Sequence, residues 1–220
     1  MITDIQQLFT DTKIAFDKSE IKRFADQNNY KWYYSVSSTK LKLDSNLIVG
    51  FNWGAADNVI YEPQIEIPIE SFEDLYNKKD LGSLQRIYNQ LKHYLSEEEI
   101  ENCVQTNFCF FRSDKEEQIS VADLALSTPL FQQLLLITKP KRIIGFSNKL
   151  RDYFLRNNLC SSVETLDIPS NKKTLFTAKG FYIAEKEEIP IYFLPHPNSK
   201  FITQARQNAW EFCFVKKTLM

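Results

Sequence analysis

The chain has 220 residues, and its 27 lysines and arginines nearly balance its 28 aspartates and glutamates, giving a formal net charge of −1. Hydrophobic residues make up 43% of it, which is enough to bury a core and excludes a globally disordered chain. No apolar run approaches the roughly 18 residues of a membrane-spanning helix, and the first residues lack the pattern of a secretion signal. We therefore expect a cytoplasmic protein without a membrane partner.

The charge is unevenly distributed along the chain. Residues 139–220 carry 14 basic and 7 acidic side chains, whereas residues 1–138 have a net charge of −8. Such a basic half could present a positive face to an anionic partner such as nucleic acid, or it could reflect ordinary solvated helix surfaces.

Cysteine and histidine usage argues against a metal site. The four cysteines contain no C-x-x-C pair, so we expect reduced and mostly buried thiols, at Cys103, Cys109, Cys160 and Cys213. Only two histidines are present, His93 and His196, which leaves few imidazole ligands. The sequence predicts neither a metal nor a cofactor.

Short buried strands alternate with helical patterns along the chain. Strands are predicted at residues 45–57, 101–113 and 141–147, with two or three more in 174–194 around a turn at Lys179-Gly180. Helices are predicted within residues 4–27, at 67–80, at 81–95, from Ser127-Thr128-Pro129 onward, at 148–158, and at the C-terminus with Ser199 as N-cap. This alternation predicts an α/β fold with parallel strands and helices on both faces.

Three polar residues stand at the ends of predicted strands. Asn52 follows the first strand, Asn107 lies in the second, and His196 follows the last, between two prolines. Ligands of parallel sheets bind outside the carboxyl ends of the strands, so these side chains could converge on one crevice. Asn52 could instead serve as a turn residue, and Asn107 could make a structural hydrogen bond to backbone.

Three motifs carry a resemblance to a known family. Residues 49–54, VGFNWG, resemble the first motif of the uracil-DNA glycosylase superfamily, G-[IM]-N-P-G, although Trp53 replaces the proline. Residues 106–111, TNFCFF, resemble the strand that supplies the uracil-reading asparagine. Residues 194–199, LPHPNS, resemble the H-P-S motif, with Asn198 in place of the serine. The mismatch-specific and single-strand-selective branches are the most similar.

The resemblance implies a fold and a chemistry. The fold would be a three-layer α/β/α sandwich around a mostly parallel four-stranded sheet, one domain over 1–220 with residues 1–40 as a helical extension. The activity would be hydrolysis of the bond between uracil, or a related damaged base, and deoxyribose, leaving an abasic site. The partner would be DNA, and the protein would be a monomer.

The resemblance also assigns roles to individual residues. Asn52 would position the attacking water, and His196 would donate a hydrogen bond to the departing base. Substrate contacts would come from Gly50, Phe51, Trp53, Gly54, Asn107 and Phe108. DNA contacts would come from Asn198, Ser199, Lys200, Phe201 and Arg206, with Phe201 as an apolar wedge.

Two other functions remain open from the sequence. The same fold could act as a binding module without catalysis if Trp53 filled the pocket. An unrelated α/β hydrolase or nucleotide-binding enzyme is a weaker reading, since no Walker A or G-x-G-x-x-G pattern occurs.

Overall fold

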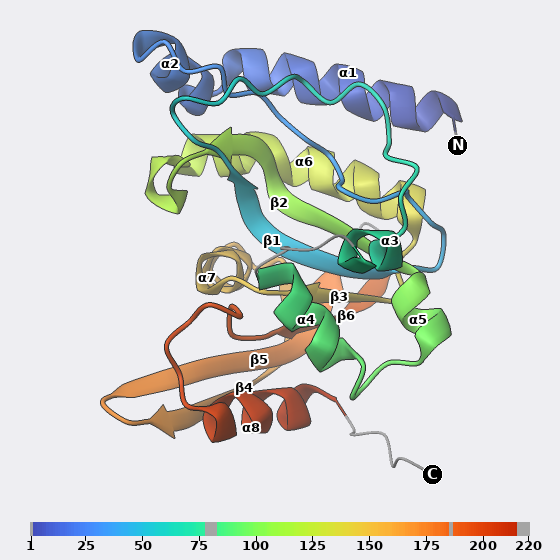
Figure 1. The fold of residues 1–220 in the computed structure, drawn as a ribbon, viewed down its shortest axis with the longest axis vertical. Coiled ribbons are helices and arrows are strands. Elements are labelled where there is room, and N and C mark those ends of the chain that lie inside the picture. Colours follow the sequence, from blue (N-terminus) through green and yellow to red (C-terminus); the bar gives the residue numbers. More distant parts are fainter. Residues whose placement is uncertain (1, 78–82, 185–186, 215–220) are drawn as a thin grey trace.

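A six-stranded sheet is the centre of the computed structural model, which describes residues 2–77, 83–184 and 187–214 (Figure 1). The strands are β1 (Asn46–Gly54), β2 (Cys103–Ser113), β3 (Arg142–Gly145), β4 (Cys160–Ser170), β5 (Lys173–Ile183) and β6 (Glu188–Phe193), in the spatial order β2-β1-β3-β6-β5-β4. The protein therefore has the α/β architecture that the alternating pattern predicts.

The prediction of a four-stranded sheet is wrong in its strand count. Strands β2, β1, β3 and β6 are mutually parallel, and the antiparallel pair β5 and β4 extends the sheet at the β6 edge. The sequence did not indicate β4 because most of its side chains are exposed or only half-buried, so it lacks a clear apolar face.

The predicted turn at Lys179-Gly180 is also wrong. Strand β5 runs through both residues, and the turn lies earlier, where Asn171 has a positive φ of 55°. Gly180 has a different reason to be glycine, because a Cβ there would lie 2.8 Å from the backbone oxygen of Ser161. Strand β4 is irregular at this point, between Ser161 and Glu164, so the missing side chain makes room for a distorted neighbour.

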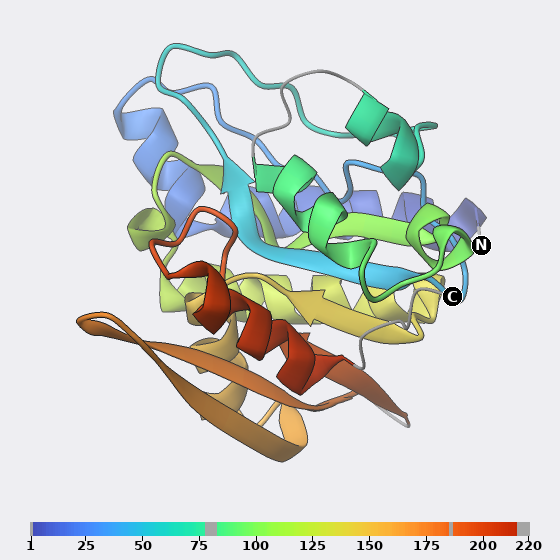
Figure 2. The same ribbon diagram turned by 60° about the horizontal axis from the view of Figure 1, so that its bottom comes forward.

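Helices cover both faces of the sheet (Figure 2). One face carries α6 (Val121–Thr138) and α7 (Asn148–Arg156), over a hydrophobic cluster that includes Phe108, Phe131 and Phe154. The other face carries α3 (Phe72–Asn77), α4 (Ser83–Leu91), α5 (Glu97–Glu101) and α8 (Thr203–Cys213). Adjacent residues of β1 alternate between these clusters, as the pleat of a strand requires.

Helix α6 begins earlier than the sequence indicated. Ser120 is its N-cap and forms a capping box with Asp123, so the helix starts at Val121 and Pro129 lies inside it. Pro129 resembled a first-turn proline, which misplaced the predicted start. By length and composition α6 is the one helix among the described residues that could cross a membrane. Half of it is buried in the protein, where it packs on α1 and β2.

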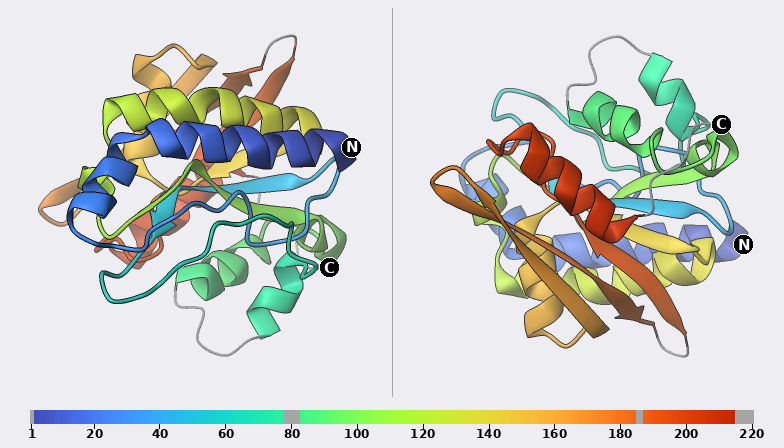
Figure 3. Two further views of the ribbon diagram at one scale, coloured as in Figure 1. Left: turned by 90° about the horizontal axis from the view of Figure 1, so that it is seen from above. Right: turned by 90° about the horizontal axis from the view of Figure 1, so that it is seen from below.

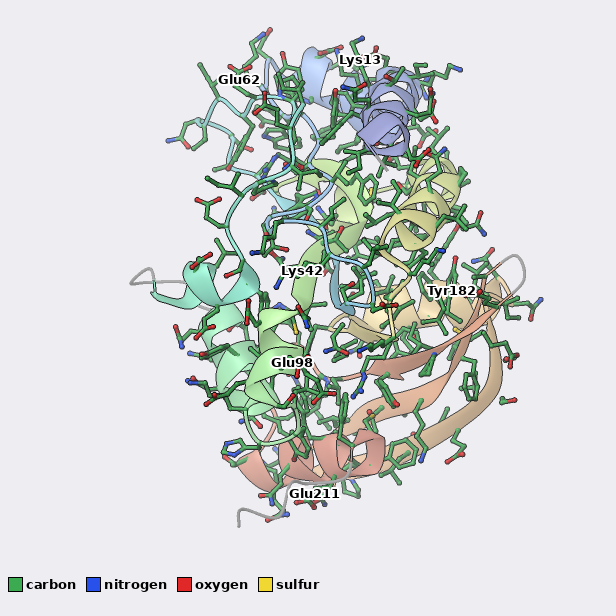
Figure 4. The ribbon with its side chains drawn as sticks, turned by 90° about the vertical axis from the view of Figure 1, so that its right-hand side faces the viewer. Lys13, Lys42, Glu62, Glu98, Tyr182 and Glu211 are labelled. Carbon is green, nitrogen blue, oxygen red and sulfur yellow. The ribbon has the colours of Figure 1, made fainter. Side chains whose placement is uncertain are left out.

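The N-terminal segment is packed onto this core. Helices α1 (Ile2–Lys18) and α2 (Glu20–Gln27) follow the predicted helical pattern and lie against α6 (Figure 3). The chain then runs along the outer edge of β2, where Tyr34 and Ser37 form isolated antiparallel bridges with Phe111 and Thr106. This contact covers a strand edge that would otherwise be open to other chains. Lys13 of α1 and Glu211 of α8 lie at opposite ends of the molecule in Figure 4.

Candidate functional site

A cavity of about 400 Å³ lies at the carboxyl ends of the parallel strands. We call it the carboxyl-edge cavity. Its walls come from β1, β2, the segments after β3 and β6, and the cover formed by α3 and α4. It is lined by Ser38, Ile48, Gly50, Asn52, Trp53, Gly54, Leu75, Ile87, Gln105, Asn107, Phe146 and His196. Six of the sequence-predicted site residues therefore line one cavity, although they are up to 146 positions apart.

Asn107 lies in the middle of this cavity. It is opposite Gly50 in the parallel register of β1 and β2, and its side chain covers the glycine backbone. A Cβ at Gly50 would lie 2.0 Å from Asn107 Oδ1, so only glycine leaves room for the amide. Asn107 is 6% exposed, and within the described residues its side chain has no hydrogen-bond partner. One amide that offers both a donor and an acceptor is thus available to a ligand.

Asn52 lies nearer the open end, and β2 fixes its orientation. Its Nδ2 donates to Ser113 Oγ at 2.8 Å and to the Trp53 backbone oxygen at 3.0 Å. The register of β1 and β2 shifts directly after Asn52, which brings Ser113 within reach. With Nδ2 occupied, Oδ1 is the acceptor that remains for a ligand or a water molecule. Ser113 was not indicated by the sequence.

His196 lies at the cavity rim and is exposed. The backbone N–H of Asn198 donates to its Nδ1 at 3.2 Å, so Nδ1 carries no proton and the neutral ring has its hydrogen on Nε2. The pKa of His196 is lowered from its ordinary value of 6.5, first by desolvation and then by the positive charge of Arg206. Neutral imidazole with an Nε2–H donor is therefore the favoured state near pH 7.

Arg206 of α8 organises the loop that carries His196. Its guanidinium donates to the backbone oxygens of Pro197 at 2.7 Å and Phe201 at 3.3 Å, and also to that of Ser199. These bonds give Arg206 a loop-holding role that the sequence did not indicate, and they leave fewer of its N–H groups for the predicted phosphate contact. The prediction that Ser199 is the N-cap of α8 is wrong. Its hydroxyl donates to the backbone oxygen of His196, and the N-cap residue is Ile202.

The predicted aromatic contacts are divided between the two faces of the sheet. Trp53 and the unpredicted Phe146 line the carboxyl-edge cavity. Phe51 is buried on the opposite face, and Phe108 is fully buried among Phe131, Tyr153 and Phe154. The strand pleat explains this, because Phe51 and Phe108 each neighbour a cavity residue in sequence and therefore point to the other face. Neither can stack on a ligand bound in this cavity.

The rim beyond His196 carries exposed polar side chains. Asn198 and Lys200 are exposed, and Asn198 Oδ1 accepts a 3.3 Å hydrogen bond from Arg86, an exposed residue of α4. Phe201, the predicted wedge, is only half exposed and packs against the cluster beneath α8. Among the described residues of this rim, Arg86 and Lys200 are cations that make no hydrogen bond to the backbone. No sequence pattern indicated Arg86.

Other predictions concern cysteine and metal chemistry. Cys103, Cys109 and Cys213 are buried, all four thiols are free, and burial raises the pKa of Cys109 to about 12. A thiol so shielded is no nucleophile near neutral pH. Among the residues that the structure describes, no group of three histidine, cysteine, aspartate or glutamate side chains could hold a metal ion.

Comparison with models of known protein families gives no match, and neither does comparison with curated protein sequences.

Proposed function

We propose that the protein is a DNA glycosylase that hydrolyses the bond between a base and its deoxyribose and leaves an abasic site. The observation that carries this proposal is the convergence of Asn52, Asn107 and His196 on one cavity. Each of these residues lies in one of the three motifs through which the sequence resembles the uracil-DNA glycosylase superfamily. The four parallel strands β2-β1-β3-β6 also agree with the sheet that the resemblance implies.

Each polar group fits one requirement of this reaction. A base turned out of the DNA stack needs a pocket that holds its hydrogen-bonding edge, and the free amide of Asn107 can provide both partners. Asn52 Oδ1, oriented by Ser113, can accept a hydrogen bond from water at the open end of the cavity. Asparagine cannot take up a proton at neutral pH, so its contribution is the position of the water.

Bond cleavage leaves negative charge on the base, and His196 is suited to stabilise it. Water oxygen bonds to C1′ of the sugar as the bond from C1′ to the base nitrogen breaks, and the bonding electrons leave with the base. The Nε2–H of neutral His196 can donate to the base oxygen on which that charge gathers. The water proton is lost to solvent, the base anion takes up a proton from solvent, and the products are a free base and an abasic sugar.

The test is release of base from labelled oligonucleotides that carry one uracil opposite guanine, opposite adenine or in a single strand. Alkaline cleavage then reveals abasic sites. Asn52→Ala and His196→Ala should each reduce the single-turnover rate by well over tenfold with DNA affinity largely kept. His93→Ala is the matched control, since His93 is exposed and outside the carboxyl-edge cavity.

A binding module without catalysis is the other candidate, and the same assay separates the two. Trp53 lines the cavity but leaves about 400 Å³ open, which favours an enzyme over a filled pocket. Absence of release together with salt-sensitive DNA binding would support the module. Equal activity of wild type, Asn52→Ala and His196→Ala would refute the site assignment.

A further inference from the structure

The antiparallel hairpin of β4 and β5 projects beyond the parallel strands at their carboxyl edge. Ala178 is the first residue of β5 that pairs with β6, and it lies opposite Phe193, the last residue of β6. The preceding residues of β5, from Lys173 to Thr177, therefore extend past the end of β6 over about 16 Å of strand. In Figure 1 the tip of this hairpin lies on the same side of the molecule as the arrowheads of β1 and β2, where the carboxyl-edge cavity is found.

Contacts with the rest of the protein hold the hairpin tip in place. One face of the hairpin is buried against α8 through Ile168 and Leu175. The backbone N–H of Ile202, at the end of the loop that follows His196, donates to Ser170 Oγ at 3.0 Å. The tip and the loop that carries His196 are therefore joined, and a ligand that binds both meets a surface of fixed shape.

The tip and this loop carry positive charge without acidic side chains. Residues 168–184 and 189–210 contain no aspartate or glutamate. Lys172, Lys173 and Lys200 are exposed, and none of them pairs with a carboxylate among the described residues. By contrast, carboxylates do pair with Lys13, Lys22, Lys42, Lys149 and Lys179. Exposed cations without acidic neighbours attract a polyanion.

The opposite flank of the carboxyl-edge cavity has the opposite charge. The segments that follow β1 and β2 carry exposed carboxylates at Asp57, Glu62 and Asp114. A polyanion that enters the cavity is repelled on that flank and attracted toward β5. In the order of the sheet, β1 and β5 are three strand spacings apart, which is about 14 Å. That distance corresponds to about four phosphates of one DNA strand, because they follow one another at roughly 3.4 Å along the helix axis.

We infer that the tip of the β4–β5 hairpin is a binding site for the DNA backbone, where Lys172 and Lys173 contact phosphates about four nucleotides from the target base. Lys200 contacts a phosphate nearer to that base. The inference rests on the proposed glycosylase function, which places the target base in the carboxyl-edge cavity. It assigns a role to β4 and β5, the two strands that the sheet has beyond its four parallel ones.

The experiment measures affinity by fluorescence anisotropy for a duplex that carries one 2′-fluoro-deoxyuridine, whose fluorine opposes bond cleavage. Lys172→Gln/Lys173→Gln should weaken binding at least about fivefold and lower the slope of log affinity against log salt by about two. Lys139→Gln/Lys141→Gln is the matched control and should leave both quantities nearly unchanged, since these exposed lysines precede β3 at the amino edge of the sheet. Equal losses in the two double variants, or no loss in the first, would overturn the inference.

Shortened duplexes locate the contact. Truncation of one flank to about two base pairs should remove the difference between wild type and Lys172→Gln/Lys173→Gln, whereas truncation of the other flank should keep it. A difference that survives both truncations would refute the assignment to the hairpin tip.

The base-release assay separates this inference from the proposed function. Binding that depends on Lys172 and Lys173, without release of base by wild type, would refute the glycosylase proposal and support the hairpin site. Release of base by wild type, together with equal DNA affinity of Lys172→Gln/Lys173→Gln, would refute the hairpin site alone. Both double variants should keep the wild-type midpoint of thermal unfolding, because the four replaced lysines are exposed.

Discussion

The side chain of Asn107 lies over the backbone of Gly50, and a Cβ on Gly50 would come within 2.0 Å of Asn107 Oδ1. This contact joins two residues 57 positions apart, and it places the unpaired amide of Asn107 directly against β1. The pair explains why the strand tolerates glycine at a position where a larger residue would support the sheet better.

Gly50→Ala should therefore damage substrate recognition more than folding. The added methyl group meets the far end of a flexible side chain, which can rotate away, so the midpoint of thermal unfolding should change little. The displaced amide can no longer meet the base, and we expect base release to fall at least about tenfold, the equivalent of roughly 1.4 kcal/mol. Asn107→Ala removes the same amide directly and should lower base release to a similar extent. Full activity of folded Gly50→Ala would contradict the assignment of Asn107.

Ser113→Ala should reduce kcat without changing KM for DNA. The substitution removes the hydrogen bond that orients Asn52, and such a bond contributes about 0.5–1.5 kcal/mol, which corresponds to a several-fold slower reaction. Ser113→Thr keeps the hydroxyl and should restore most of the rate. A parallel loss of stability with unchanged kcat would show that Ser113 acts on the fold alone.

The rate of base release should fall in acid. Neutral His196 donates from Nε2 while Nδ1 accepts from Asn198, and protonation of Nδ1 removes that arrangement. Since desolvation and Arg206 lower the pKa of His196, the rate should hold through pH 6.5 and fall only below it. Arg206→Gln removes the nearby positive charge, so the pKa should rise and the acid limb should move to higher pH. A rate–pH profile of both proteins measures this, and identical acid limbs would argue against electrostatic control by Arg206.

Phe108 should support the stability of the fold, whereas Trp53 should support base release. Phe108→Ala empties part of the core beside Phe131 and Phe154 and should lower the free energy of unfolding by about 3–5 kcal/mol. Trp53→Ala should cost far less stability, because Trp53 is only half-buried and lines the cavity, but it should slow base release. Chemical denaturation and release kinetics on both variants distinguish the roles. A large stability loss in Trp53→Ala would place it in the core instead.

Arg86 and Lys200 should contribute to DNA affinity through phosphate contacts. Replacement of either by glutamine should weaken binding to all DNA sequences alike and reduce the slope of log affinity against log salt by about one. Arg206→Gln should leave that slope nearly unchanged, because its guanidinium is bound to loop carbonyls. Salt titrations monitored by fluorescence anisotropy give both quantities. A slope change in Arg206→Gln alone would reverse this assignment.

The sequence by itself determined the local pattern of the protein. The apolar runs of β1, β2 and β3 identified three parallel strands, since strands buried on both faces are almost continuously hydrophobic. The same reasoning selected Asn52, Asn107 and His196 as polar residues at or near strand ends, and the structure places Asn52 and Asn107 inside β1 and β2. Sequence patterns did not reveal β4, because its mostly exposed side chains show no regular alternation of apolar residues. They also misplaced the start of α6 at Pro129, which resembles a first-turn proline.

Only the tertiary structure decided which residues share a face of the sheet and which polar groups already have a hydrogen-bond partner in the protein. The pleat places Gly50 and Asn107 in the cavity and turns Phe51 and Phe108 away from it. The register shift after Asn52 brings Ser113 to its amide, and the path of residues 33–38 along β2 brings Ser38 to Gln105. The commitment of Arg206 to loop carbonyls likewise depends on the packing of α8. Local pattern carries no information on such contacts, because they join segments that only the sheet holds together.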